Sequence, residues 1–300
     1  MEIKKLLPGV KKNVLLKNYT TFRIGGRAKY FFITKGKEDL IKAIKAAKRL
    51  KLPFFILGGG SNILVSDKDF NGLVIKFGQP LSDYVSKGLE WAAGIPGTVQ
   101  GAVCGNAGAF GKSMEDAVKS VEVFNAKTGK IEVFKNKDCQ FDYRGSIFKR
   151  KKNLIILSVK IKSRKSNQKK IKEYLDYRRQ HHPQLPSAGS IFKNFQLPTF
   201  NFQLLTKKFP EFGEFKKRGD IPAAFLISQC GLTGKKIDGA QISEKHPNFI
   251  VNLRKAKAKD VKKLIKLAKQ KIKKKFGIIL EEEIQFLGFP HLTDFLEVKK

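Results

Sequence analysis

Cysteine is scarce in this sequence. The 300 residues include three cysteines, Cys104, Cys139 and Cys230, which are scattered and form no CxxC pair. An odd, scattered set argues against a disulfide framework and a cysteine-based zinc site, and it fits a reducing compartment. The four histidines show no metal-ligand spacing either, because His181 and His182 are adjacent and poorly arranged to bind one ion. We therefore expect no metal site.

Long apolar runs are absent as well. None approaches the roughly 18 residues of a membrane span. The opening segment, MEIKKLLPGVKKN, also lacks the apolar core of a signal peptide. The sequence predicts a soluble, cytoplasmic protein without membrane insertion.

Acidic residues are few. Asp and Glu number 26 against 61 Lys and Arg, which gives a formal net charge of +35 at pH 7. Such a charge is typical of proteins with polyanionic partners, including nucleic acid, nucleotides and acidic lipid. The basic residues recur along the whole chain, however, and do not form one tail. This distribution favours lysine-covered, solvated faces over a dedicated nucleic-acid surface.

The segment from Tyr30 to Gly60 predicts a β-α-β unit. A strand at 30–33 precedes a helix that begins at about Glu38, and the buried strand FFIL ends at three consecutive glycines. The helix has an apolar face made of Leu40, Ile41, Ile44, Ala47 and Leu50. Glycines at a strand end let backbone amides close on an anion, although an ordinary tight turn has the same pattern. Ile63 stands where GxGxxG needs its third glycine, which argues against a Rossmann dinucleotide site.

Residues 93–111 combine six glycines with other small residues and carry no charged side chain. Pro96 and the glycine density favour a loop that contains a short helical turn. Tight helix packing and an irregular loop are the plain interpretations. The functional interpretation is a backbone-lined groove for a large, flat, phosphorylated cofactor.

The rest of the chain predicts an α+β protein with a break near residue 165. The polar segment 163–170 is typical of a linker, and the strongest helix is 258–276. That helix has a core stripe of Val261, Ile265, Ala268, Ile272 and Phe276. Other expected elements are a hairpin at Thr128–Gly129, a helix stopped by Pro183, a helix between Pro222 and Gly231, and a closing strand at 281–288.

Eight blocks of this sequence, in order, are similar to those of one enzyme family. They are NYTTFRIGGRA, ILGGGSNILVSD, GLEWAAGIPGTVQGAVCGNAGAFG, FDYRGSIFK, YRRQ, AGSIFKN, GLTGKKIDGAQISEKHPNFIVN and EEEIQFLG. The chain resembles the UDP-N-acetylenolpyruvoylglucosamine reductases, the MurB-type flavoenzymes of peptidoglycan precursor synthesis. The compact stretch from Tyr177 to Asn194 resembles the shorter branch of the family, which lacks a tyrosine-bearing loop.

The resemblance implies a fold and two cofactors. Residues 1–165 would form an FAD-binding domain of the vanillyl-alcohol-oxidase type, with two α+β subdomains at about 1–76 and 77–165. An α+β substrate-binding domain, 166–300, would follow. FAD would bind non-covalently, and NADPH would be the co-substrate. The matching cofactor-binding residues are Gly58, Gly59, Gly60, Ser61, Asn62, Gly94, Thr98, Asn106 and Gly108.

The family reaction, reduction of an enolpyruvyl ether to a lactyl ether, needs a cation beside the carboxylate and a proton for the carbanion-like carbon. By resemblance, Arg144 supplies the cation, Ser190 supplies the proton and Glu283 is the catalytic carboxylate. Taken alone, each residue has a plain alternative: a surface salt bridge, a turn or N-cap serine, and an acidic cluster. Glu281 and Glu282 compete with Glu283 for the last role.

The predicted activity is NADPH-dependent, FAD-mediated reduction of UDP-N-acetylglucosamine enolpyruvate to UDP-N-acetylmuramate. The substrate-binding candidates are Tyr143, Lys193, Asn194 and Gln241, with Lys193 neutralising phosphate. The expected partners are the UDP-sugar and NADPH, without nucleic acid, and the expected state is a cytoplasmic monomer serving cell-wall formation. One alternative is a related FAD-dependent oxidoreductase with another substrate. The other is a basic nucleic-acid-binding or structural protein on a degenerate flavoprotein scaffold.

The sequence departs from the family pattern in three places. Only QPLSDYVSK, residues 79–87, remains of a strand and most of a helix, which predicts an exposed sheet edge or a looser cofactor. Gln100 replaces a usual glycine. The phenylalanine-rich segment 195–220 is longer than the usual connection, and one hypothesis is that it covers the gap.

Overall fold

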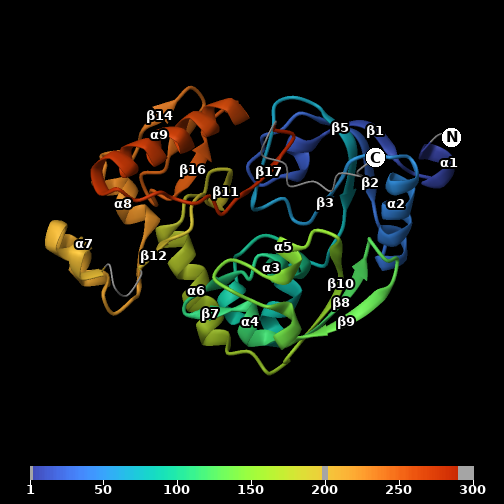
Figure 1. Cartoon of the computed structure of the whole chain (residues 1–300), viewed down its shortest axis with the longest axis horizontal. Coiled ribbons are helices and arrows are strands. Elements are labelled where there is room, and N and C mark those ends of the chain that lie inside the picture. The colour runs from blue at the N-terminus through green and yellow to red at the C-terminus, as the bar shows by residue number, and fades with distance from the viewer. Residues whose placement is uncertain (1–2, 198–201, 290–300) are drawn as a thin grey trace. The chain divides into compact units, whose positions relative to one another are not determined.

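The chain folds into two compact units in the computed structural model, which describes residues 3–197 and 202–289 (Figure 1). Of the described residues, 3–180 and 286–289 form an N-terminal unit, and those between 181 and 285 form a C-terminal unit. Both units mix helices with strands, so the protein is of the α+β class. In the described part of the chain, no helix is long and apolar enough to cross a membrane.

The first sheet of the N-terminal unit contains the predicted β-α-β segment. β2 (Arg27–Ile33) and β3 (Phe54–Leu57) both run parallel to β5 (Phe70–Lys76), which lies between them. β1 (Lys11–Leu15) pairs antiparallel with β2. α2 (Lys37–Arg49) connects β2 to β3, and its predicted apolar face is confirmed. On that face Leu40, Ile44 and Ala47 are buried, while Ile41 and Leu50 are half-buried against the same core.

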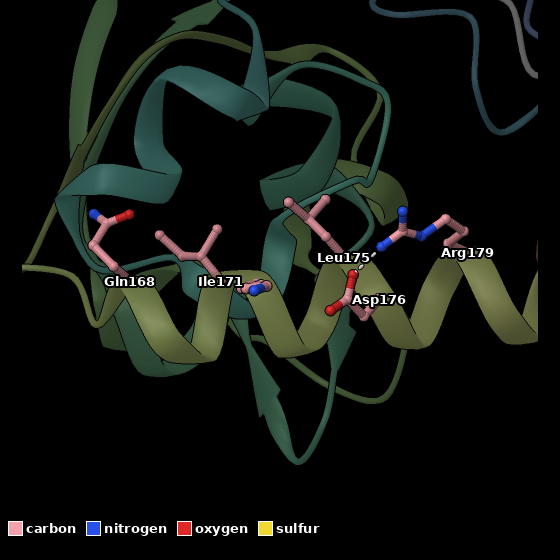
Figure 2. Close-up of a pocket in the computed structure, with 6 residues that line it drawn as sticks. Gln168, Ile171, Leu175, Asp176 and Arg179 are labelled. Atoms are coloured by element: carbon pink, nitrogen blue, oxygen red, sulfur yellow. Dashed lines mark hydrogen bonds and ion pairs between the residues drawn. The ribbon is translucent and has the colours of Figure 1, made fainter.

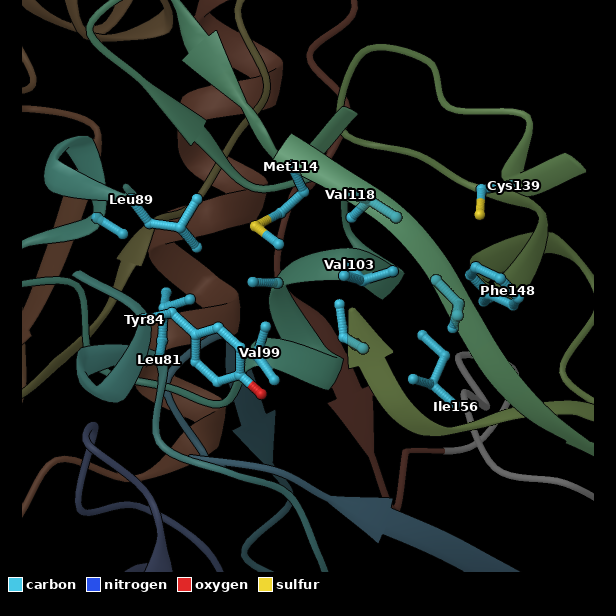
Figure 3. Close-up of a cluster of buried hydrophobic side chains, with 14 of the residues drawn as sticks. Leu81, Tyr84, Leu89, Val99, Val103, Met114, Val118, Cys139, Phe148 and Ile156 are labelled. Carbon is cyan, nitrogen blue, oxygen red and sulfur yellow. The ribbon is translucent and has the colours of Figure 1, made fainter. Parts of the chain in front are cut away.

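The second sheet of this unit has three antiparallel strands. β8 (Val118–Asn125) lies between β9 (Ile131–Lys135) and β10 (Leu154–Ile161). The predicted hairpin joins β8 to β9, and Gly129 in its turn has a φ of +77°, a conformation that favours glycine. The six-residue helix α3 (Val99–Cys104) is the helical turn expected in the glycine-rich stretch. Figure 3 shows Val99 and Val103 of this helix within a core that also contains Leu81, Tyr84, Met114 and Val118.

Several short elements complete the N-terminal unit. They are α1 (Ile3–Leu6), η1 (Leu16–Tyr19), β4 (Ile63–Val65), η2 (Leu81–Lys87), η3 (Glu90–Ala92), β6 (Gly108–Ala109), β7 (Lys112–Ser113), α4 (Met114–Ala117), η4 (Asn136–Cys139) and α5 (Ile147–Arg150). The predicted closing strand is β17 (Gln285–Leu287), which pairs with β4. The chain therefore returns from the C-terminal unit to complete the N-terminal one.

The shortened segment 79–87 is well packed. Leu81 is 1% exposed and Tyr84 is 9% exposed, and both belong to a core cluster of the N-terminal unit. The Tyr84 hydroxyl donates a hydrogen bond to Gln79 Oε1 at 2.6 Å. The side chains of Leu81 and Tyr84 thus hold this segment against the core.

Gln100 forms a hydrogen bond with the β10 strand of the second sheet. Its side chain is buried; Oε1 accepts a hydrogen bond from the Gln79 N–H at 3.0 Å, and Nε2 donates to the Leu157 carbonyl at 3.3 Å. Leu157 belongs to β10, which pairs only with β8 among the described strands and is irregular between Ile156 and Ser158. Gln100 therefore links the start of the segment 79–87 to β10 through its two side-chain hydrogen bonds.

Replacing Gln100 by alanine should destabilise the protein by about 1–3 kcal/mol, because the buried Leu157 carbonyl would lose its donor and the Gln79 N–H would lose its acceptor. The midpoint of chemical denaturation measures this change. The exposed Gln168 provides a matched control, since Gln168→Ala should shift the free energy of unfolding by no more than about 0.5 kcal/mol. Equal stability of the two variants would contradict the bridging role of Gln100.

The C-terminal unit is built on one four-stranded antiparallel sheet. Its strands, in spatial order, are β11 (Ser187–Ser190), β16 (Phe249–Asn252), β15 (Ala240–Ile242) and β14 (Lys236–Ile237). α9 (Ala258–Phe276) packs on β14 and β15 (Figure 1). The predicted core stripe of α9 is confirmed, because all five of its residues are buried. The helix predicted after Pro222 is also confirmed, as α8 (Ala223–Gln229).

The phenylalanine-rich segment contributes to the core of the C-terminal unit itself. It connects β12 (Phe195–Gln196) to β13 (Asp220–Ile221), and its helical parts are α7 (Phe202–Lys208) and η5 (Pro210–Phe215). The fully buried Phe212 ring lies 5.3 Å from the ring of Phe276 in α9, measured between centroids. The hypothesis that this segment covers the gap at 79–87 stays a prediction, and residues 198–201 of the segment lie outside the described residues.

The helix stopped by Pro183 is α6 (Gln168–His181), and it begins inside the predicted linker. This helix belongs to the N-terminal unit. Arg178 of α6 donates hydrogen bonds of 2.8 Å to the carbonyls of Trp91 and Ala93. These contacts tie α6 to the N-terminal unit, and the domain boundary near residue 165 stays a prediction.

Candidate active site

The two predicted cofactor segments lie against each other in the N-terminal unit. A Cβ added to Gly59 would lie 2.4 Å from the Cα of Gly97, and one added to Gly58 would lie 2.6 Å from Thr98 Oγ1. Gly60 has a φ of +68°, and a Cβ there would meet the Tyr19 carbonyl at 2.1 Å. All three positions therefore require glycine, which leaves the backbone as the surface of the loop.

Ser61 and Asn62 follow the three glycines of the first segment. A Cβ on Gly97, whose φ is +140°, would lie 3.0 Å from Ser61 Oγ. Asn62 is exposed at the end of the loop, directly before β4. Thr98 is buried and caps α3, because its Oγ1 accepts a hydrogen bond from the Gly101 N–H at 3.2 Å. The glycine loop thus lies beside the first turn of a short helix.

Asn106 joins the second segment to the turn that carries Arg144. Asn106 is 4% exposed; its Nδ2 donates to the Asp142 carbonyl at 2.8 Å, and its Oδ1 accepts from the Glu115 N–H at 3.0 Å. Arg144 has a φ of +58°, and its Nη2 donates to the Gly108 carbonyl at 3.0 Å. The structure therefore brings Arg144 together with two predicted cofactor residues. Tyr143, the residue before it, is 38% exposed.

Lys76 is a site residue that the sequence analysis missed. It is the last residue of the otherwise apolar end of β5, and its Nζ donates to the carbonyl of Gly58 in the glycine loop. Burial lowers the pKa of the Lys76 ammonium. The sequence feature that could have identified Lys76 is a single lysine directly after the apolar run LVI. Lys76 thus places a positive charge in direct hydrogen-bond contact with the neutral loop.

A hollow of about 550 Å³ runs along one face of α6. It is lined by Gln168, Ile171, Lys172, Leu175, Asp176 and Arg179. Figure 2 shows Ile171 and Leu175 projecting from the same side of the helix, with Asp176 paired to Arg179. None of the predicted site residues lines this hollow. Leu175 approaches one of them, since a Cβ on Gly94 would lie 3.2 Å from Leu175 Cδ2.

The C-terminal unit brings Ser190 and Glu283 close together along the backbone. Ser190 ends β11, and the next residue, Ile191, accepts a hydrogen bond from the Glu283 N–H at 2.8 Å. Phe192 and Glu282 form an antiparallel bridge beside this contact. Sequence spacing alone gives no hint that these two segments are neighbours.

The two competing glutamates are engaged in ion pairs. Glu281 Oε2 lies 3.0 Å from Lys193 Nζ, and Glu282 Oε1 lies 2.9 Å from Lys269 Nζ. Of the three glutamates, Glu283 is the one whose backbone N–H donates to Ile191, the residue after Ser190. The assignment of Glu283 as the catalytic carboxylate stays a prediction.

The other substrate candidates also have protein partners in the C-terminal unit. Asn194 Nδ2 donates to Asp220 Oδ2 at 3.0 Å, and its Oδ1 accepts from the Ala223 N–H at 3.2 Å. Gln241 is 7% exposed and donates to the Gly234 carbonyl and to Glu244 Oε1. Gln241 lies in β15 of the same sheet as Ser190, and Asn194 follows the segment after Ser190. Over the described ranges, no group of His, Cys, Asp and Glu could hold a metal ion.

Three comparisons with known proteins place the chain in a family. Residues 180–287 match the family model for the C-terminal domain of UDP-N-acetylenolpyruvoylglucosamine reductase. A reductase of that name from Caldicellulosiruptor bescii is 38% identical over 303 residues, covering 91% of this chain and 89% of the relative. The chain belongs to the UDP-N-acetylenolpyruvoylglucosamine reductase family. The resemblance inferred from the eight sequence blocks is therefore confirmed.

Other members of this reductase family are similar to this chain over nearly its whole length. The reductase of Anoxybacillus flavithermus is 35% identical and covers 93% of this chain and 94% of its own length. The crystal structure of UDP-N-acetylenolpyruvylglucosamine reductase (MurB) from Thermus caldophilus is 30% identical, with a TM-score of 0.69 over 93% of this chain and 98% of that one. The family is one of flavoprotein oxidoreductases in peptidoglycan synthesis, as the resemblance implied.

Proposed function

We propose that this chain reduces UDP-N-acetylglucosamine enolpyruvate to UDP-N-acetylmuramate with electrons from NADPH and with bound FAD. The observation that carries the proposal is the placement of Ser190 and Glu283 on adjoining backbone segments, in a chain that belongs to the reductase family. Arg144, held on a tight turn beside Asn106 and Gly108, supports the same activity.

The residues of the N-terminal unit fit FAD. The loop at 58–60 and the facing segment at 97–98 leave backbone where any side chain would clash, and neither contains a charged residue. Such a surface suits a pyrophosphate held by backbone amides. Lys76, hydrogen-bonded to this loop, adds one positive charge. We infer that this unit is the FAD-binding domain of the vanillyl-alcohol-oxidase type and that the C-terminal unit binds the UDP-sugar.

Each catalytic residue has one chemical task in this proposal. Bound FAD would supply the hydride chemistry that links NADPH to the terminal carbon of the enol ether, and the residues of this chain would bind the substrate and protonate it. Negative charge then develops on the neighbouring carbon and spreads into the carboxylate, which the planar fork of Arg144 holds and stabilises. Ser190 Oγ delivers the proton to that carbon. The carboxylate of Glu283 acts at the carbon that receives this proton. Lys193 neutralises the negative charge of a phosphate of the substrate.

The product provides the direct test of this function. Purified protein should oxidise NADPH when UDP-N-acetylglucosamine enolpyruvate is added, and mass spectrometry should find UDP-N-acetylmuramate, which is two hydrogens heavier than the substrate. A flavin-containing protein that consumes NADPH without forming this product would instead be a related oxidoreductase. A protein that lacks flavin and binds DNA would support the nucleic-acid alternative.

The flavin should be present in about one copy per chain and should not be covalently attached. The motivation is two glycine-rich segments, 58–62 and 93–111, which contain no histidine and a single cysteine, Cys104. Acid precipitation followed by flavin absorbance of the two fractions measures the attachment. All flavin should stay in the supernatant. Yellow colour in the pellet would contradict non-covalent binding.

A further inference from the structure

The backbone around Ser190 leaves the regular ladder of its sheet. β11 pairs with β16 through Ser187 and Val251 and again through Ser190 and Phe249, with an irregular register between these pairs. Gly189 has a φ of +76°, which redirects the chain immediately before Ser190. Beyond Ser190, β11 ends, so something other than a regular strand pairing must hold the residues that follow.

Asn248 takes over where the ladder stops. Its side chain is 4% exposed; Oδ1 accepts from the Phe192 N–H at 3.0 Å, and Nδ2 donates to the Phe192 carbonyl at 2.8 Å. Its own carbonyl accepts from the Ile191 N–H at 2.8 Å. The amide of Asn248 thus replaces a peptide unit of β16 and extends the pairing to the residues that follow Ser190.

The other edge of the segment that follows Ser190 forms hydrogen bonds with the segment that contains Glu283. The Ile191 carbonyl accepts from the Glu283 N–H at 2.8 Å, and the Lys193 N–H donates to the Glu281 carbonyl at 2.9 Å. These bonds, with those from Asn248, satisfy both backbone groups of Ile191 and of Phe192, as buried backbone requires. The side chain of Asn248 alone supplies the partners of Phe192.

We propose that Asn248 is a positioning residue for the reduction, acting through Phe192 to hold Ser190 and Glu283 at a fixed separation. This inference rests on the proposed function, since it assumes that Ser190 donates the proton. Loss of the Asn248 side chain frees both backbone groups of Phe192 and lets the segment after Ser190 shift relative to Glu283. A displacement of about 1 Å in a catalytic group slows a reaction by up to about 10²-fold.

Asn248→Ala tests the proposal when it is compared with Asn252→Ala. Asn252 is a matched control because it is a buried asparagine of the same region whose Oδ1 also accepts a backbone N–H, that of Ala256 at 3.1 Å. Hydrogen exchange should be about 10-fold faster at the Phe192 amide in Asn248→Ala and unchanged there in Asn252→Ala. This measurement needs neither substrate nor NADPH.

Stopped-flow absorbance of the flavin in the holoprotein then separates positioning from general stability. Reoxidation by UDP-N-acetylglucosamine enolpyruvate should be about 10- to 100-fold slower in Asn248→Ala than in Asn252→Ala, while reduction by NADPH should be equal in the two. Asn248→Asp keeps the size and the acceptor for the Phe192 N–H, and it should fold and slow reoxidation less than Asn248→Ala does.

Two results would overturn the positioning role: unchanged exchange at Phe192, or faster exchange with reoxidation equal to that of Asn252→Ala. If Asn248→Ala does not fold, wild-type reoxidation in Asn248→Asp would overturn it equally. Failure of the proposed function is a different result, because then the wild-type flavin itself would not be reoxidised by the enol ether.

Discussion

Ser190→Ala should slow reoxidation of the flavin by the enol ether by ~10²–10⁴-fold, the usual contribution of a positioned general acid. A serine hydroxyl is a weak acid, but the carbanion-like carbon is a strong base, so the transfer is chemically sensible. FAD binding and reduction by NADPH should stay near wild type, because neither step uses this proton. Stopped-flow absorbance of the flavin measures both half-reactions in one protein.

Ser187→Ala is the matched control for this experiment. Ser187 lies in the same strand, and its hydroxyl makes a local contact, accepting from the Gly189 N–H at 3.5 Å. Both half-reactions should therefore stay close to wild type in Ser187→Ala. If Ser190 is only a turn residue, its loss lowers stability without separating the half-reactions. Unchanged reoxidation in a folded Ser190→Ala protein would end its assignment as the proton donor.

Arg144→Lys should also impair the second half-reaction, by about 10²–10³-fold, because a point charge replaces a planar fork at the developing carboxylate charge. In contrast to Ser190→Ala, it should weaken binding of the UDP-sugar as well. The structure adds a second reason, since Nη2 of Arg144 also donates to the Gly108 carbonyl and so helps to fix its own direction. Titration of the flavin spectrum with substrate measures the affinity.

Arg150 offers the matched comparison for Arg144. It lies in α5, pairs with Asp142 and donates to the Gln140 carbonyl at 2.7 Å, and it has no role in the proposed chemistry. Arg150→Lys should leave substrate affinity and reoxidation near wild type. If Arg144→Lys behaves like Arg150→Lys in both measurements, Arg144 is a structural arginine and another cation must stabilise the carboxylate.

Local patterns predicted much of the fold. The apolar period of α2 and α9 and the glycine of the β8–β9 turn are properties of neighbouring residues, and the structure confirms them. The partner of Gln100 is different, since Leu157 lies 57 residues away and no local pattern connects the two. The start of α6 was also missed, because polar residues at 168–170 are typical of both a linker and an exposed first helical turn.

The candidate site was less accessible to pattern analysis than the fold. Ser190, Arg144 and Glu283 were named through the family resemblance, and on spacing alone each had a plain structural alternative. What joins Ser190 to Glu283 is hydrogen bonding between segments that lie far apart in the sequence. The sequence also gave no signal for Asn248, because the Phe192 backbone that it contacts lies 56 residues away in the chain.

The most direct test of the central claim is an anaerobic experiment on the purified wild-type protein. NADPH is added first, and the oxidised flavin absorbance should be lost. UDP-N-acetylglucosamine enolpyruvate is then added without any other oxidant, and the absorbance should return as UDP-N-acetylmuramate forms in an amount equal to the flavin. A flavin that NADPH does not reduce, or that stays reduced in the presence of the enol ether, would contradict the claim that this chain is the reductase.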